Sequence, residues 1–149
     1  MSAAGITDIG CPLCAGDGGR LLVRNDAWRV VLAGDSDYPP FTRVIWNAHV
    51  AEMSDLGDAD RAELMRVVLD VERLQRAQLA PDKINLASFG NLVPHLHWHV
   101  VPRWRDDRHF PEPVWGRAAD GRDGAVEARR AWAADRVEAY VDALKLRLA

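Results

Sequence analysis

The amino-acid sequence predicts an α+β fold, in which an antiparallel sheet has one helix inserted between its strands and another helix at the C-terminus. Three observations lead to this prediction. Short apolar runs are separated by turn residues, and two longer stretches carry an apolar repeat of three and four residues. A chain of 149 residues is long enough to bury a hydrophobic core, and we expect one domain over residues 1–149.

The N-terminal third of the chain has the pattern of three consecutive strands. Residues 20–24 and 27–32 are two apolar runs on either side of the turn residues Asn25 and Asp26, which favours a hairpin. After a polar loop, residues 42–46 form a third run rich in β-branched and aromatic side chains.

The helical repeat begins near residue 58 and continues to residue 80. Pro81 ends it, because proline cannot continue a helix, and strands are expected over 83–88 and 95–103. One face of the helix carries the apolar residues Leu64, Val67, Val68, Val71 and Leu74.

The C-terminal part of the sequence divides into an irregular stretch and a helix. Residues 104–124 are rich in proline, glycine and charged side chains, which predicts an irregular segment within the domain and not a linker between domains. The helix that follows has an apolar face made by Val137, Tyr140, Val141, Leu144 and Leu148.

Charge and hydropathy exclude several classes of protein. The net charge of −3 argues against broad nucleic-acid binding, which needs a basic surface. No apolar run approaches the roughly 20 residues that a membrane span requires. The N-terminus also lacks the basic start and apolar core of a signal peptide. We therefore predict a cytoplasmic protein that takes neither nucleic acid nor a membrane as partner.

Three histidines occupy alternate positions near residue 97. Side chains alternate across a strand, so His95, His97 and His99 are expected on one face, about 7 Å apart. The opposite face then carries the core residues Leu96, Trp98 and Val100. Two chemistries fit such a row. Neighbouring histidines can chelate a catalytic metal, or one neutral imidazole can act as a nucleophile while its neighbours orient it or protonate the leaving group.

The run His-Leu-His-Trp-His-Val-Val resembles the His-x-His-x-His-x-x motif of the histidine-triad (HIT) superfamily. The order of the flanking segments, 47–50, 83–85 and 90–91, is also similar to that family. The resemblance covers about residues 8–105, and residues 107–115 resemble the tail of a bacterial branch. It implies a single HIT domain with its core at 8–105 and a C-terminal extension and helix at 106–149.

The resemblance implies a nucleotide hydrolase or nucleotidyl transferase that forms a covalent nucleotidyl-histidine intermediate. His97 corresponds to the nucleophile, and His99 to the residue that contacts the phosphate and assists the leaving group. The nucleotide-binding positions implied are Asn85, Asn91 and Asp35. Asp35 is equally consistent with an ordinary turn aspartate. Some relatives carry a fourth histidine ahead of the third strand, and this sequence has Phe41 there.

Cys11 and Cys14 form a Cys-x-x-Cys pair, which is a common half of a zinc site. Branches of the HIT superfamily and the related galactose-1-phosphate uridylyltransferases complete such a site with two histidines. The resemblance assigns these positions to His49 and His95, so we expect a structural zinc. A reduced pair without metal and a thiol redox role are the alternatives.

Two other functions stay open at this point. The three histidines could be ligands of a zinc-dependent hydrolase or lyase, or the chain could bind nucleotide without catalysis. For the enzyme, the expected substrate is a nucleoside phosphoryl compound, either a dinucleoside polyphosphate or a nucleoside phosphoramidate. The resemblance also implies a homodimer.

Overall fold

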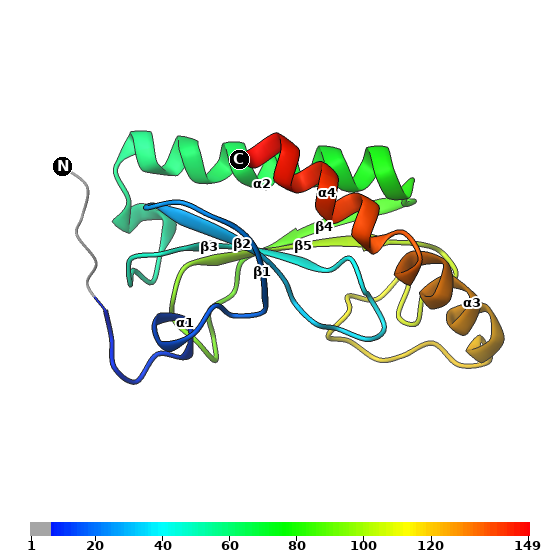
Figure 1. Ribbon diagram of the computed structural model, residues 1–149. Coiled ribbons are helices and arrows are strands. Elements are labelled where there is room, and N and C mark those ends of the chain that lie inside the picture. The colour runs from blue at the N-terminus through cyan, green and yellow to red at the C-terminus, as the bar shows by residue number, and fades with distance from the viewer. Residues whose placement is uncertain (1–6) are drawn as a thin grey trace.

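The computed structural model describes residues 7–149, and within this range it contains one five-stranded antiparallel sheet (Figure 1). The strands are β1 (Arg20–Arg24), β2 (Trp28–Leu32), β3 (Thr42–Trp46), β4 (Lys83–Ala87) and β5 (His97–Arg103). Their order across the sheet is β1-β2-β3-β5-β4. The last strand in sequence, β5, therefore lies between β3 and β4.

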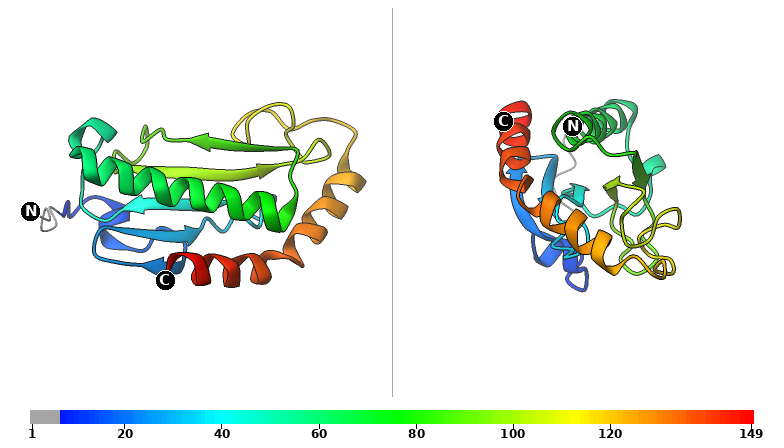
Figure 2. Two further views of the ribbon diagram at one scale, coloured as in Figure 1. Left: turned by 90° about the horizontal axis from the view of Figure 1, so that it is seen from above. Right: turned by 90° about the vertical axis from the view of Figure 1, so that its right-hand side faces the viewer.

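Two of the helices cover one face of this sheet. The helical segments are α1 (Pro12–Ala15), the 3-10 turn η1 (Met53–Asp55), α2 (Asp58–Leu79), α3 (Asp123–Ala134) and α4 (Val137–Leu148). Helices α2 and α4 lie side by side on the same face, as Figure 2 shows from above. Helix α2 ends at Leu79, two residues before Pro81, and the intervening Ala80 adopts a left-handed conformation with φ of 43°.

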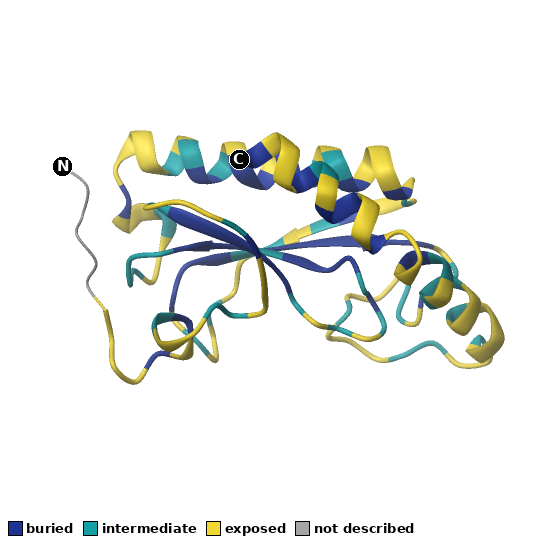
Figure 3. Ribbon diagram, in the orientation of Figure 1, coloured by how far each residue is buried: buried dark blue, intermediate teal, exposed yellow. Residues whose placement is uncertain are grey.

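The main hydrophobic core lies between the sheet and these two helices. It contains fully buried residues from each layer, among them Val30, Val44, Val100, Leu64 and Tyr140. Figure 3 shows the buried strands beneath helices whose outer faces are exposed. The opposite face of the sheet is covered by the N-terminal segment with α1 and by loops, and this is the face that carries the polar groups of the site.

The α+β fold predicted from the sequence is confirmed, with two differences. Strand β5 begins at His97 and not at residue 95, because the amide of His95 donates within a turn to the carbonyl of Val93. The expected C-terminal helix is two helices that meet at Asp135 and Arg136.

The irregular segment after β5 is held against the sheet by a buried ion pair. Arg103 donates from Nε to Asp107 at 2.7 Å and from Nη2 to the carbonyl of Glu112 at 2.7 Å. Asp107 also accepts hydrogen bonds from Tyr38 and from the amide of Phe110. Burial opposes ionisation of Asp107, but the Arg103 guanidinium and backbone amides hold its pKa below the ordinary value.

We expect Asp107→Asn to destabilise the protein by about 3 kcal/mol at pH 7, because it leaves the buried Arg103 charge without its counter-ion. A carboxylate with a depressed pKa stabilises the fold above its unfolded pKa of about 3.9 and loses this effect as the pH falls through the folded value. The difference between wild type and variant should therefore shrink below about pH 4. Denaturant unfolding at pH 7 and pH 3 measures it.

Asp106→Asn is the matched control. Asp106 is partly exposed and pairs with Arg129, so its loss should change the stability by less than about 1 kcal/mol. An Asp107→Asn protein that unfolds at the wild-type denaturant concentration would contradict the structural role of this pair.

Candidate active site and metal centre

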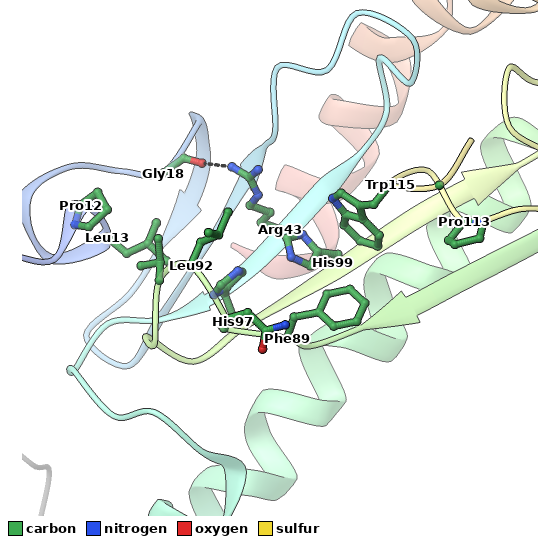
Figure 4. Close-up of a pocket in the computed structure, with 14 residues that line it drawn as sticks. Pro12, Leu13, Gly18, Arg43, Phe89, Leu92, His97, His99, Pro113 and Trp115 are labelled. Carbon is green, nitrogen blue, oxygen red and sulfur yellow. Dashed lines mark hydrogen bonds between the residues drawn. The ribbon is translucent and has the colours of Figure 1, made fainter. Parts of the chain in front are cut away.

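A cavity of about 740 Å³ opens on the face of the sheet opposite α2 and α4, between the sheet and the loops that cover it (Figure 4). His97 and His99 reach it from β5, and both are largely buried, with 9% and 7% of their surface exposed. Their rings lie 4.8 Å apart between centroids. The volume is in the range of small-molecule binding sites.

One hydrogen bond fixes the tautomer of His97. Its Nδ1 lies 2.5 Å from the carbonyl oxygen of His95. A carbonyl only accepts, so Nδ1 carries the proton and Nε2 keeps its lone pair. Burial lowers the pKa of His97, and the nearby Arg43 charge lowers it further. The imidazole is therefore neutral at pH 7 and has a free nucleophilic nitrogen.

His99 is also held neutral. Burial, with smaller effects from His97 and Arg43, lowers its pKa to about 3. Its Nδ1 is buried and has no hydrogen-bond partner within residues 7–149. An anion bound beside it would favour a second proton on the ring, so His99 can give either a neutral N–H or a proton to a bound phosphate.

Aromatic side chains surround His99. Phe41 and Trp115 contact its ring edge-on, with centroids 5.4 and 5.1 Å away. Phe89 packs against Trp115 at 5.0 Å. Phe41 stands where some relatives have a fourth histidine, so an apolar contact occupies this position in the present chain.

The three residues expected to bind nucleotide take different places. Asn91 lines the cavity. Asn85 lies on β4 outside the lining and accepts a hydrogen bond from Arg103 at 2.7 Å. Asp35 also lies outside the lining and accepts the amides of Asp37 and Tyr38, as a turn aspartate does. Nucleotide binding by these residues stays a prediction.

Arg43 is a cavity residue that the sequence does not single out. It lies on β3 directly opposite His99 in the ladder, so both side chains project from the same face. Its Nη1 donates to the carbonyl of Gly18 at 2.8 Å. Burial lowers the pKa of Arg43, but a guanidinium stays charged at neutral pH. The alternation of strand 42–46 places Arg43 on the face of Ile45; only the β3–β5 register places it beside His99.

The two cysteines and two histidines expected to bind zinc lie together beside this cavity. The candidate ligand atoms of Cys11, Cys14, His49 and His95 are all within 4.8 Å of one another. The Cys11 sulfur is 3.4 Å from His95 Nδ1, and the Cys14 sulfur is 3.5 Å from Nδ1 of both histidines. A tetrahedral zinc with ordinary bond lengths separates sulfur and nitrogen ligands by about 3.6 Å. The donor set and its spacing therefore fit zinc.

The second nitrogens of both histidines are oriented for this role. His95 Nε2 donates to the carbonyl of Trp46 at 2.6 Å, which leaves Nδ1 unprotonated and facing the sulfurs. His49 Nε2 lies 3.8 Å from a carboxylate oxygen of Asp8. Burial raises the pKa of the Cys14 thiol, which disfavours the redox alternative because the thiolate is the reactive species. When bound, zinc would fix the N-terminal segment to the strand entry that precedes His97.

A zinc-dependent enzyme with three histidine ligands is not supported by this geometry. His95 directs its free nitrogen to the cysteines, while His97 uses Nδ1 for a carbonyl. Within residues 7–149 the residues that converge as possible metal ligands are the four of the Cys/His cluster, without His97 or His99.

Among the helices of the described chain, none is long and apolar enough to cross a membrane.

Comparisons with known proteins agree with the fold and the histidine row. Over residues 18–106 the chain matches the family described as HIT domain. A histidine triad protein from Bradyrhizobium japonicum superposes with a TM-score of 0.69 and 27% identity, covering 89% of this chain and 92% of that one. A histidine triad protein from Marinobacter aquaeolei has the same fold, with a TM-score of 0.64, 22% identity, and coverage of 84% and 94%.

A curated relative gives a similar but shorter match. The chain is 33% identical over 84 residues to AP-4-A phosphorylase of Mycobacterium tuberculosis, covering 52% of this chain and 43% of that protein. The chain thus spans less than half the length of this relative.

An antiparallel sheet with helices on one face and a buried histidine row on the other defines a histidine-triad protein. The match covers more than half of the sequence, and the chain belongs to the HIT domain family. A Cys-x-x-Cys pair precedes its HIT domain.

Proposed function

We propose that this protein is a nucleotide hydrolase or nucleotidyl transferase that cleaves nucleoside phosphoryl compounds through a covalent intermediate on His97. The observation that carries the proposal is the unprotonated Nε2 of His97 beside a cavity of ligand size. The relative named AP-4-A phosphorylase supports a nucleotide with a phosphoanhydride bond as substrate.

In the first step, Nε2 of His97 attacks the phosphorus and the bond to the leaving group breaks. The N–P bond leaves a positive charge on the imidazole, and the carbonyl of His95 stabilises it through Nδ1–H. His99 donates to the phosphate oxygens or to the departing atom. In the second step, water or phosphate attacks the phosphorus, the N–P bond breaks, and His97 returns to its neutral form while the acceptor's proton is released.

A substrate panel tests the function directly. Purified protein is incubated with adenine and guanine dinucleoside polyphosphates and with nucleoside phosphoramidates, each with water alone and with added phosphate. We expect release of a nucleoside monophosphate in water, and a nucleoside diphosphate if phosphate is the acceptor. Binding without turnover of any member would favour the non-catalytic alternative.

His99→Ala should affect poor leaving groups more than good ones. Acid assistance contributes on the order of 10²–10³ to departure of a poor leaving group, and far less where the leaving anion is already stable. The measurement is kcat for nucleotide aryl esters whose phenols differ in pKa, with the slope against leaving-group pKa steeper in the variant. An equal loss of kcat for all esters of the series would contradict a leaving-group role for His99.

A further inference from the structure

Arg43 is half-buried, and unlike the buried arginines Arg29 and Arg103 it leaves most of its hydrogen-bonding capacity unused. All three side-chain nitrogens of Arg29 and of Arg103 have acceptors in the protein. Within residues 7–149, Arg43 has a partner for Nη1 alone, and its buried Nε has none. A buried donor without an acceptor is unfavourable. Nη2 also lacks a partner within residues 7–149 and is not among the fully buried atoms, so a ligand in the cavity can provide its acceptor.

No carboxylate of the described residues neutralises this charge by an ion pair within 4.0 Å. Asp35 acts on it only through longer-range attraction and uses one oxygen for backbone amides. A permanent positive charge that lines the cavity without an ion-pair partner is suited to an anion.

The guanidinium is fixed in place by Gly18. This residue has a left-handed φ of +83°, and a Cβ there would lie 2.6 Å from Leu13 and 2.8 Å from Ile45. Glycine therefore allows the carbonyl of residue 18 to approach and bind Nη1 of Arg43. Figure 4 shows this bond, with the guanidinium of Arg43 turned toward Gly18 and with His97 and His99 farther along the same cavity. A fixed guanidinium loses little entropy when it binds phosphate oxygens.

We propose that Arg43 binds the phosphate groups of the leaving group and makes the enzyme selective for phosphoanhydrides over phosphoramidates. This deepens, and rests on, the proposed function. Arg43 pairs with His99 and not with His97 in the ladder between β3 and β5, and His99 is the residue to which the proposed function assigns assistance of the leaving group. As Nε2 of His97 bonds to phosphorus and the P–O bond breaks, the electron pair goes to a polyphosphate leaving group. The positive charge of Arg43 stabilises the negative charge that develops on this leaving group. An amine leaving group carries no negative charge and gains nothing from Arg43.

The test compares two substrates that share one nucleotidyl group, a dinucleoside tetraphosphate and a nucleoside phosphoramidate. Arg43→Gln removes the charge but keeps polar donors. We expect kcat/KM to fall about 100-fold or more for the tetraphosphate and less than about fivefold for the phosphoramidate. Arg43→Lys keeps the positive charge but loses the paired N–H donors of the guanidinium. It should retain more of the tetraphosphate activity than Arg43→Gln. Arg105→Gln removes an exposed charge outside the cavity and should change neither rate.

Calorimetry with inorganic tripolyphosphate provides a measurement that does not depend on turnover. Its affinity should fall about tenfold in Arg43→Gln and stay unchanged in Arg105→Gln. Equal losses on both substrates, or unchanged tripolyphosphate affinity in Arg43→Gln, would overturn the role of Arg43. A wild-type protein that turns over neither substrate would overturn the proposed function instead.

Discussion

Replacing His97 with alanine is expected to lower kcat by on the order of 10⁴-fold or more, because the proposed mechanism forms its N–P bond on this side chain. Nucleotide affinity and melting temperature should change little, since His97 contributes one hydrogen bond to the fold. Steady-state turnover on the best substrate of the panel measures the loss, and calorimetry and thermal unfolding control for binding and folding.

The covalent intermediate gives a second measurement on the same variant. Phosphoramidate bonds to histidine survive in alkali, so wild-type protein quenched in alkali during turnover should retain label from the nucleotide, and His97→Ala should retain none. His99→Ala keeps the nucleophile and is the matched control, which should still be labelled. Near-normal kcat in His97→Ala, or equal labelling of it, would refute the nucleophile.

Loss of the Cys/His cluster should produce the largest change in stability. A metal site that forms only in the folded chain contributes its binding free energy to folding. For Cys11→Ser we expect a loss on the order of 5 kcal/mol or more, which corresponds to about 10–20 °C in melting temperature. Elemental analysis of protein purified without chelator should find one zinc per chain in the wild type and less in the variant.

Non-additivity provides the control for this experiment. If each cysteine acts through one shared ion, Cys11→Ser, Cys14→Ser and the double variant should melt at nearly the same temperature. A chelator should lower the melting temperature of the wild type to that of the variants and leave the melting temperature of the double variant unchanged. When assayed in the cold, each single cysteine variant should keep most of its activity although its melting temperature is lower. His95→Ala should lose both activity and stability, because loss of the His95 side chain loosens the backbone whose carbonyl orients His97. Metal-free protein and cysteine variants that melt like the wild type would show that the cluster is not a zinc site.

The sequence by itself determined the elements of the fold and the alternate spacing of the three histidines. Apolar periods of two and of three to four residues are local properties of a chain, and they predicted the strands and helix α2 to within two residues. The spacing of His95, His97 and His99 is equally local. The gathering of Cys11 and Cys14 with His49 and His95 was predicted only from family resemblance, because the segments are far apart in sequence.

The tertiary structure decided which groups meet across the sheet. The pairing of Arg43 with His99 depends on the register between β3 and β5, and a register is fixed by packing of the whole sheet and not by either strand alone. Trp115 reaches His99 because the buried Arg103–Asp107 pair holds the preceding segment. The tautomers of His95 and His97 follow from single contacts with backbone carbonyls. Such contacts have no sequence period, so only the folded chain shows that the unprotonated nitrogen is Nε2 in His97 and Nδ1 in His95.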